Sequence, residues 1–454
     1  MRSLARSLPP VLMLAVTAMP AGAASFSDGF VPPASKQGVF EYRTDLPPAV
    51  LAERSRRLGQ FGAGYVQVNL FWSELESANA GSSPTPLPCP TGHRMEPASE
   101  AERVRLGFHR FRCIEAAKLA RTDALFRRDR LYGFQSGAVL WSSPPAYRDP
   151  ACAGTPGPIG KQSCAPRPDA MDDFEDFLNL VASRWNGRDG RGKLSHFILW
   201  NENAAPEYFD VSPAASHTDL SPAAVALRLD TLAEMMRRAH AALTRHQHAS
   251  LLYVSTDALW ASGLRPGHLG SRQLLDGLWQ RLGTDYSWSV AVHPYGRVDA
   301  PAPDSVYTYA NLGMVARHQE ERLRARGVAH PERAPQMQLI ASEQGWGLRE
   351  YGGRRGQAEQ ICRAHAAAMR LPTLVAEANN YFQSIEPAET EAGGASSQGS
   401  FFGLLPASLP PTLAGIEAVP TGQAYIATFD AEHWGRSDGH FCCQSFGEGC
   451  ARQP

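Results

Sequence analysis

Short apolar runs alternate along this chain with longer segments in which apolar residues recur every three or four positions. The clearest run, 197–200, reads Phe-Ile-Leu-Trp, which is typical of a strand buried on both faces. The other runs predict strands over 38–42, 64–72, 137–141, 251–256, 289–296, 337–346 and 379–383. Helical spacing predicts helices over 48–61, 174–181, 221–243, 271–282, 311–326, 357–371 and 423–429, with further helical sequence of unplaced breaks over 99–127.

This alternation, sustained over most of the chain, predicts a parallel sheet. About eight strands favour a (β/α)8 TIM barrel over an open doubly wound sheet. No Gly-x-Gly-x-x-Gly motif follows the first strand, which argues against a dinucleotide-binding domain. We therefore expect one barrel domain over residues 38–430 with long loop insertions at 80–97, 149–168 and 385–420, and a Cys-rich C-terminal tail, 431–454, packed on the barrel.

The first residues of the chain have a different pattern. Arg2 and Arg6 precede an apolar run over 11–16, and Ala21-Gly22-Ala23 follows as a small-residue cleavage site. This arrangement predicts a secretory signal peptide over residues 1–23, and its apolar run is too short to span a bilayer. No later stretch is predicted as a membrane span, so we expect a mature protein that is secreted or periplasmic.

The eight cysteines are an even number, and all of them follow the predicted signal peptide. Their spacing matches no zinc-binding pattern, so in an exported protein they predict disulfides. Cys152 with Cys164 would close one Pro- and Gly-rich loop, and Cys89 with Cys113 another. The three cysteines after residue 441 could hold the tail, with Cys362 as one possible partner, and the sequence leaves the pairing open.

Charge is nearly balanced, with 44 Lys and Arg residues against 45 Asp and Glu residues. Such a chain has no electrostatic footprint for nucleic acid or for an acidic membrane surface. No set of metal ligands is evident, so neither a metal nor a cofactor is predicted. The sequence does not indicate an oligomeric state.

Polar and aromatic side chains follow several predicted strands, at the end that forms the active face of a parallel barrel. Glu202 follows the strand over 197–200, and Glu343 lies near the end of the strand over 337–346. Two carboxyls across a cleft suit acetal hydrolysis, in which one protonates the leaving oxygen and the other supports the oxocarbenium-like centre. Aromatic rings offer flat faces for sugars. The other candidate substrate-binding residues are Asn201, His293, Tyr295, Trp72, Trp141 and Trp346.

Each of these residues also has a purely structural interpretation. Asn201 and Glu202 could cap a strand and open a loop, and each aromatic ring could pack in the barrel core. His293 could equally be a buried histidine that is hydrogen-bonded within the core. The hypothesis of a site therefore depends on the convergence of these side chains on one face.

Three motifs in this order resemble the clan-A retaining glycoside hydrolases: Trp200-Asn201-Glu202 after a central strand, His293-Pro294-Tyr295 two strands later, and Glu343 at the end of the next. That superfamily is a TIM barrel with an Asn-Glu acid/base on its fourth strand and a nucleophilic Glu on its seventh. The predicted strand count puts Glu202 and Glu343 on those strands. The resemblance also includes 66–74 and 402–405, and covers about residues 38 to 430.

The resemblance implies a role for each matching residue. Glu202 would be the general acid/base, and Glu343 would attack the anomeric carbon to form a glycosyl-enzyme. Asn201 would hydrogen-bond the sugar 2-hydroxyl. Tyr295 would hold and tune Glu343, and His293 would line the cleft.

One departure from the family pattern bears on the activity. Many clan members carry an Arg on the second strand, where this chain offers Gln67 and Asn69, and loss of that cation would leave the Glu343 anion less stabilised. The expected function is an exported retaining glycoside hydrolase that cleaves O-glycosidic bonds of a poly- or oligosaccharide, with this carbohydrate as its partner. The alternative is a TIM-barrel protein that binds glycans without cleaving them, which the missing Arg favours.

Overall fold

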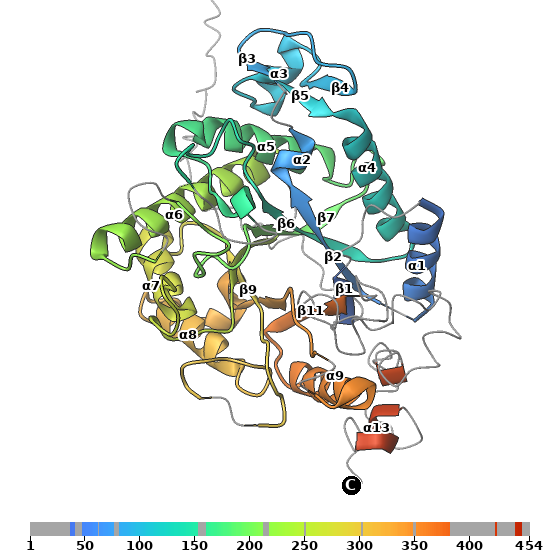
Figure 1. Ribbon diagram of the computed structural model, residues 1–454, viewed down its shortest axis with the longest axis vertical. Coiled ribbons are helices and arrows are strands. Elements are labelled where there is room, and N and C mark those ends of the chain that lie inside the picture. Colours follow the sequence, from blue (N-terminus) through green and yellow to red (C-terminus); the bar gives the residue numbers. More distant parts are fainter. Residues whose placement is uncertain are drawn as a thin grey trace, which may run out of the picture.

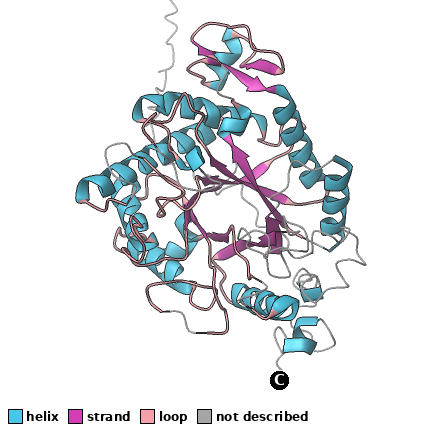
Figure 2. Ribbon diagram, viewed as in Figure 1, coloured by secondary structure: helices cyan, strands magenta, loops and turns pink. Residues whose placement is uncertain are grey.

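Eight parallel strands close into a barrel that is surrounded by helices (Figures 1 and 2). The computed structural model describes residues 37–40, 48–61, 63–76, 81–152, 160–211, 218–248, 251–300, 303–347, 351–381, 423–424 and 441–446. In order around the barrel the strands are β1 (Gln37–Phe40), β2 (Tyr65–Phe71), β6 (Gln135–Trp141), β7 (Leu194–Leu199), β8 (Leu251–Thr256), β9 (Ser289–Val292), β10 (Leu339–Ala341) and β11 (Leu374–Tyr381), which pairs with β1. The predicted (β/α)8 fold is confirmed.

A helix follows each of the first seven barrel strands. The helix that follows β7 shows how the sequence sets these elements: Ser221 accepts a hydrogen bond from the Ala224 N–H, and Pro222 takes the first helical position. Leu229, Leu232 and Met236 then bury one stripe against the barrel. These helices are α1 (Pro48–Phe61), α4 (Ala116–Leu131), α5 (Met171–Arg184), α6 (Pro222–Arg245), α7 (Ser271–Leu282), α8 (Gly313–Arg324) and α9 (Gly353–Met369).

Aromatic rings fill the interior of the barrel around Tyr65, the first residue of β2. The rings of Tyr65 and His196 meet edge to face with centroids 5.1 Å apart, and the Tyr253 ring lies 5.5 Å from that of His196. Gly137 on β6 makes room for this layer, because a Cβ atom there would lie 2.0 Å from the Tyr65 hydroxyl. Gln67 accepts a hydrogen bond from that hydroxyl and is fully buried, so one of the two residues that could stand in place of the family's Arg is part of the packed interior.

The region between β2 and α4 differs from the prediction of a loop and a helix. It contains an antiparallel sheet of β3 (Ser82–Ser83), β5 (Phe111–Glu115) and β4 (His93–Glu96), together with α3 (Glu100–Leu106) (Figure 1). Gly107 ends α3 in the left-handed conformation, with φ of 71°, and so provides the break that the apolar spacing did not reveal. The short α2 (Trp72–Leu75) leads from β2 into this insertion.

A buried arginine joins this insertion to the barrel. Arg112 on β5 is 1 % exposed and donates to Glu76, Asp173 and Asp176 at 2.8, 2.5 and 3.0 Å. Asp173 and Asp176 belong to α5, so the small sheet and the barrel share one ion-pair network. A buried cation with three carboxylate partners fixes the position of the sheet.

Three disulfides connect the described residues. Cys89–Cys113 and Cys152–Cys164 confirm the two predicted loop closures, and Cys362–Cys442 joins α9 to α13 (Phe441–Phe446) in the tail. The disulfides are consistent with a location outside the cytoplasm. Within the described ranges, no helix combines the length and apolar character that a membrane crossing requires. The predicted signal peptide, the loop over 385–420 and most of the helix predicted over 423–429 lie outside the described residues.

Three predicted strands have different limits in the structure. The strand over 289–296 ends at Val292 and the strand over 337–346 spans only Leu339–Ala341, so the residues that follow lie on loops at the barrel rim. The last strand begins at Leu374, five residues before the predicted start at 379. Among the residues after β9 and β10, Tyr295 and Glu343 are partly exposed, whereas His293 and Trp346 stay buried.

Candidate active site

The carboxyl ends of β7, β9 and β10 bring Glu202, His293 and Glu343 together. His293 Nδ1 lies 2.8 Å from Glu202 Oε1 and 4.0 Å from Glu343 Oε2. Glu202 Oε1 and Glu343 Oε2 therefore cannot be farther apart than these two distances added together. This upper limit is close to the short end of the roughly 6.5–9.5 Å that separates the two carboxyls of inverting glycosidases. Two carboxyls that are distant in the sequence therefore share one small region of the barrel rim.

The backbone that carries Glu202 is held in an unusual conformation. Trp200 and Glu202 have φ angles of 62° and 40°, which side chains other than glycine rarely adopt. Ser255 at the end of β8 fixes the turn, because its hydroxyl accepts from the Glu202 N–H at 3.0 Å and its carbonyl accepts from the Asn203 N–H at 3.1 Å. The Asn203 side chain in return accepts from the Ser255 N–H at 3.0 Å. Backbone strain of this kind clusters at functional sites.

Two serine hydroxyls face the second nitrogen of His293. Ser342 Oγ lies 3.1 Å from His293 Nε2, and Ser255 Oγ lies 3.4 Å from it. A hydroxyl can either donate or accept a hydrogen bond. Both tautomers of the His293 ring therefore find a partner at Nε2 while Nδ1 faces Glu202.

The carboxyl of Glu202 has a proton affinity suited to acid catalysis near neutral pH. Burial raises the pKa of Glu202 to about 7, and its side chain is only 13 % exposed. The hydrogen bond from His293 acts in the opposite direction, whereas the charges of Asp257 and Glu343 add to the increase. Burial alone would lower the pKa of His293, but the charges of Glu343 and Glu202 outweigh it and raise this pKa.

Glu343 is more exposed than Glu202 and is held by a phenol. Its side chain is 20 % exposed, and Glu343 Oε1 accepts a hydrogen bond from the Tyr295 hydroxyl at 2.6 Å. A donor at this distance stabilises the carboxylate form. Tyr295 therefore occupies the position that the sequence predicted beside Glu343.

Asn201 lies on the same rim and keeps an uncommitted side chain. It is 7 % exposed, and within the part of the chain that the structure describes its amide forms no hydrogen bond. A buried amide without a partner loses several hydrogen bonds to water. Its donors and acceptor are available for a polar ligand such as a sugar hydroxyl.

The three tryptophans predicted to bind substrate are enclosed by protein. Trp72 is 1 % exposed, stacks on Tyr147 with ring centroids 5.1 Å apart, and donates to Glu76 at 3.0 Å. Trp346 has no exposed surface and donates to the Gly296 carbonyl at 2.9 Å. Trp141 is 5 % exposed, and its indole N–H is buried without a hydrogen-bond partner among the described residues. The structure thus brings the carboxyls, His293, Tyr295 and Asn201 together, and places Trp72 and Trp346 in packing roles.

Tyr208 is a rim residue that sequence reasoning missed. The charge of Glu202 is the leading cause that raises the Tyr208 pKa, followed by burial and the charge of Glu343, so both carboxyls act on its phenol. The Tyr208 carbonyl accepts from the Trp200 indole at 2.8 Å. A tyrosine six positions after Glu202, in the same strand-end loop, was the available signal.

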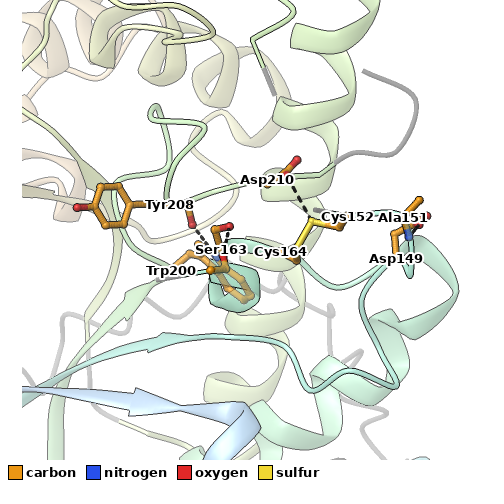
Figure 3. Close-up of a disulfide and its surroundings, with 9 residues drawn as sticks. Asp149, Ala151, Cys152, Ser163, Cys164, Trp200, Tyr208 and Asp210 are labelled. Carbon is orange, nitrogen blue, oxygen red and sulfur yellow. Dashed lines mark hydrogen bonds between the residues drawn. A yellow bond between two sulfur atoms is a disulfide. The ribbon is translucent and has the colours of Figure 1, made fainter. Parts of the chain in front are cut away.

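A disulfide holds the loop that carries Tyr208 (Figure 3). The Cys152–Cys164 bond lies beside Asp210, whose Oδ2 is 3.2 Å from Cys152 Sγ. The Asp210 N–H donates to the Ser163 carbonyl at 3.0 Å, and the Asp210 carbonyl accepts from the Ala165 N–H at 2.8 Å. Figure 3 shows Tyr208 projecting from this loop on the side away from the disulfide.

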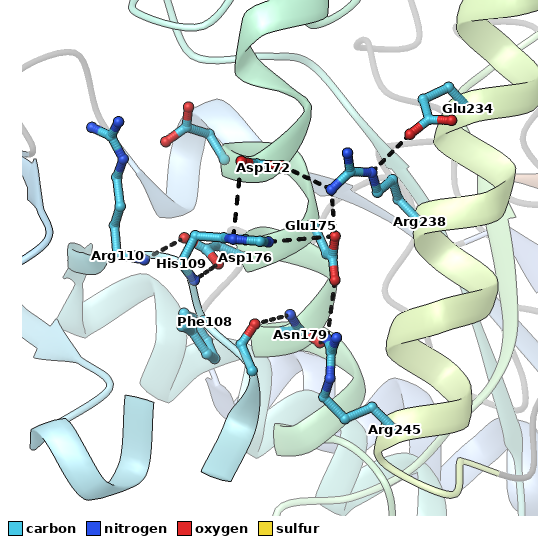
Figure 4. A network of polar contacts seen from close by, with 12 residues as sticks. Phe108, His109, Arg110, Asp172, Glu175, Asp176, Asn179, Glu234, Arg238 and Arg245 are labelled. Carbon is cyan, nitrogen blue, oxygen red and sulfur yellow. Dashed lines mark hydrogen bonds and ion pairs between the residues drawn. The ribbon is translucent and has the colours of Figure 1, made fainter. Parts of the chain in front are cut away.

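Two groups of potential metal ligands do not fit a metal. Cys152 and Cys164 converge with Asp210, but a disulfide leaves no thiolate to bind a cation. His109, Asp172 and Glu175 form the second group (Figure 4). There Glu175 is already paired with two guanidinium groups, Arg238 at 2.6 Å and Arg245 at 3.1 Å, whose charges disfavour a cation.

Comparison with known proteins agrees with this fold. A family of unknown function, DUF5722, matches residues 166–298, which include Glu202 and His293. No curated protein sequence matches the chain. A β-glycosidase from the hyperthermophile Thermosphaera aggregans superposes with a TM-score of 0.52 at 10 % identity, over 88 % of this chain and 96 % of that one.

Two further solved structures match over most of this chain. A GH5_18 protein from Streptomyces cattleya, in complex with Manb1-4GlcNAc, has a TM-score of 0.52 and 13 % identity over 90 % of this chain and 82 % of its own. A family 39 glycoside hydrolase from the gut symbiont Bacteroides cellulosilyticus WH2 has a TM-score of 0.48 and 14 % identity over 87 % of this chain. This chain spans 64 % of that protein. The structural neighbours are clan-A TIM-barrel glycoside hydrolases, and at these identities the likeness is one of fold.

Proposed function

We propose that this protein is an exported retaining glycoside hydrolase that cleaves an O-glycosidic bond of a poly- or oligosaccharide. The observation that carries the proposal is the approach of Glu202 and Glu343 to one atom, His293 Nδ1, at 2.8 and 4.0 Å. Retaining enzymes place their two carboxyls about 5–5.5 Å apart, so that one attacks the sugar that the other protonates. The fold of retaining glycosidases and the three disulfides support this chemistry and the export.

The reaction has two steps, each with one proton transfer. In the first, the Glu343 carboxylate forms a bond to the anomeric carbon while the carboxylic acid of Glu202 gives its proton to the departing glycosidic oxygen. In the second, the Glu202 carboxylate takes a proton from water, the water oxygen bonds to the anomeric carbon, and the bond to Glu343 breaks. A pKa of about 7 lets Glu202 carry a proton that it gives away in the first step and, as a carboxylate, accept one in the second.

His293 adapts to both charge states of Glu202. When Glu202 is an anion, His293 Nδ1–H donates to it. When Glu202 is neutral and no substrate is bound, its O–H donates to Nδ1 and the ring proton lies on Nε2; a bound glycosidic oxygen then replaces Nδ1 as the acceptor of that O–H. The Ser342 hydroxyl, which is nearer to Nε2 than the Ser255 hydroxyl, accepts from Nε2–H in the second state and donates to Nε2 in the first. His293 is thus a positioning residue whose tautomer follows the proton on Glu202.

A mechanism-based inactivator tests the proposal. A panel of 2-deoxy-2-fluoro glycosides with activated leaving groups would be incubated with the full chain, and the mass of each proteolytic peptide measured. We expect one fluoroglycosyl group on Glu343, and the sugar that reacts identifies the substrate class. The same reagents should leave Glu343→Gln unlabelled.

A glycan-binding barrel without catalysis is the second candidate function. It is favoured by the absence of the second-strand Arg that many glycosidases of this fold carry. This chain offers Gln67 and Asn69 there, and Gln67 is hydrogen-bonded to Tyr65 inside the barrel. Binding of polysaccharides without turnover of any aryl glycoside, and without labelling of Glu343, would favour this candidate and contradict the enzymatic one.

A further inference from the structure

A second pocket, of about 340 Å³, lies at the end of the barrel opposite to Glu202. Its walls are the C-terminal ends of α5 and α6, the insertion around α3, and the turn over 186–193 that leads into β7. Glu202 follows the last residue of β7, whereas this turn precedes its first, so the two sites are separated by the full length of the strand. The basic residues that line the pocket are Arg105, Arg184, Arg188, Arg191, Arg245 and His246.

Three of these arginines are neutralised by carboxylates. Arg184 pairs with Asp123 at 2.7 Å, Arg245 pairs with Glu175 at 3.1 Å, and Arg105 pairs with Glu102 at 3.4 Å; Glu102 also lines the pocket. These ion pairs form a rigid frame around the cavity. They leave no net charge of their own to attract a ligand.

Arg188 and Arg191 remain without a carboxylate partner among the described residues. Arg188 approaches only Gln247, at 3.4 Å from its carbonyl and 3.3 Å from its side-chain oxygen, and Arg191 forms no ion pair. Both stand on the turn over 186–193, which Arg130 holds by donating to the Gly187 carbonyl at 2.7 Å. Two further acids line the pocket: Glu96 pairs with Arg94 and lies 3.6 Å from Arg184, and Asp189 is the neighbour of Arg188. The two arginines without a carboxylate partner therefore outnumber the one acid, Asp189, that is left to balance them.

Burial and the excess positive charge lower the pKa of basic groups around the pocket. The pKa of His246 is lowered to about 4 by burial first and then by the charges of Arg245, Arg105 and Arg188. The pKa of Lys193 is lowered by burial and by the charge of Arg130. Facing groups on α5 and α6 are Arg184, Asn179 and Arg245, of which Asn179 accepts through Oδ1 from His246 Nε2–H at 3.2 Å.

We propose that this pocket binds a tetrahedral oxyanion, a phosphate or a sulfate group, through the guanidinium groups of Arg188 and Arg191. Guanidinium groups present paired N–H donors that match two oxygens of such an anion. The pocket is larger than a single ion requires, so the group is either free or carried on a larger molecule. This site is independent of the carboxyl pair at the other end of the barrel.

Calorimetric titration tests the site directly. The full chain would be titrated with inorganic phosphate and with inorganic sulfate at constant ionic strength, held by potassium chloride. We expect binding to the parent protein and at least a tenfold weaker affinity for R188Q/R191Q. The matched control R317Q/R333Q removes the same charge from two exposed arginines on and after α8, and should keep the parent affinity. Equal affinities of the two double variants, or a heat signal reproduced by potassium chloride alone, would overturn the proposal.

Three additional measurements check the site without relying on the folding of a double variant and identify the source of the anion. Bound phosphate should raise the pKa of His246, because the anion offsets the arginine charges. This pKa would be followed by NMR of the His246 ring protons in the parent protein, and an unchanged pKa at saturating phosphate contradicts the site.

The single variant R188Q, which alters only an exposed side chain, should also weaken binding. Dextran sulfate that binds more tightly than sulfate at equal sulfate concentration assigns the site to a carried group, and equal affinity assigns it to the free ion.

Discussion

His293 Nδ1 lies 2.8 Å from Glu202 Oε1, so the imidazole and the carboxyl share one hydrogen bond. The contact joins the end of β9 to the end of β7, and the same nitrogen is 4.0 Å from Glu343. An imidazole at this place can compensate a carboxylate and can also accept from a carboxylic acid. The contact therefore links the protonation state of Glu202 to the orientation and tautomer of one ring.

Removal of either carboxyl should abolish activity without unfolding the protein. Glu202→Gln and Glu343→Gln are each expected to lower kcat/KM by at least a thousandfold on the substrate found with the fluorinated glycosides, since each removes a group that reacts. Glu74→Gln is the matched control: this glutamate also lies just beyond a barrel strand but pairs with Lys118. Its activity should stay within a few-fold of the parent, and equal losses in all three variants would contradict the assignment.

The pH dependence should have a basic limb near neutrality. Glu202 must be protonated to act as an acid, and its pKa of about 7 means that the active form is lost above that pH. We expect kcat/KM to fall about tenfold per pH unit above pH 8. The profile would be recorded in buffers of constant ionic strength, and a plateau that continues to pH 9 would exclude Glu202 as the acid.

Glu202 should reduce the stability of the fold at alkaline pH. Its pKa in the folded protein is raised above its value in the unfolded chain, so the folded state binds the extra proton, and stability falls as pH rises from about 4.5 to about 7. Glu202→Gln removes the buried charge. It should be about 1–3 kcal/mol more stable than the parent at pH 8, with little difference at pH 4, in urea unfolding. A pH-independent difference would contradict the burial of a charged Glu202.

The Ser342 hydroxyl should matter for turnover more than for binding. Ser342→Ala removes the nearer partner of His293 Nε2 and leaves Ser255 at 3.4 Å. Loss of one hydrogen bond corresponds to about 1 kcal/mol, so we expect kcat to fall roughly five- to tenfold with KM unchanged. The basic limb of the pH profile should also move, which a merely structural role would not cause.

Ser342→Thr is the control for that experiment because it retains a hydroxyl. Its kcat and its pH profile should be close to those of the parent. Nitrogen NMR of the His293 ring reports the tautomer directly, and a single fixed tautomer from pH 5 to pH 9 would contradict the proposed alternation.

The Cys152–Cys164 disulfide should position Tyr208 as well as stabilise the fold. Closure of a loop of this length is worth about 3 kcal/mol at most in the chain-entropy account. The double variant C152S/C164S is expected to be less stable by about 1–3 kcal/mol and to lose activity, because Asp210 and Tyr208 lie on the loop that the disulfide holds. A variant that is less stable but fully active would separate the two effects and contradict a role for the loop in the site.

The barrel and its carboxyl pair could be predicted because they follow from local patterns. Apolar runs such as 197–200 and the Ser221-Pro222 cap signal begin their elements where the structure has them, or within a few residues. The strand count then fixes which residues share the rim. Glu202, His293 and Glu343 were therefore accessible to sequence reasoning once eight strands were counted.

The remaining features depend on contacts that no local pattern encodes. Trp72 and Trp346 have the composition of sugar-binding residues, but Glu76 and the Gly296 carbonyl accept their indole protons inside the protein. Ser255 and Ser342 are ordinary serines until the register of β8, β9 and β10 brings them to His293. The strand Phe111–Glu115 was hidden because it is short and lies between two helical segments.

The ion-pair network around Arg112 limits how this protein can be reshaped. Excision of the segment 81–115 in one piece would take the cation away and leave Asp173 and Asp176 on α5 as unmatched anions under the surface. Removal of one partner from a buried ion pair typically lowers the free energy of unfolding by about 3–5 kcal/mol, a large part of the stability of a domain. The insert is therefore no detachable module: shortened or chimeric versions of the protein must replace those aspartates in the same step.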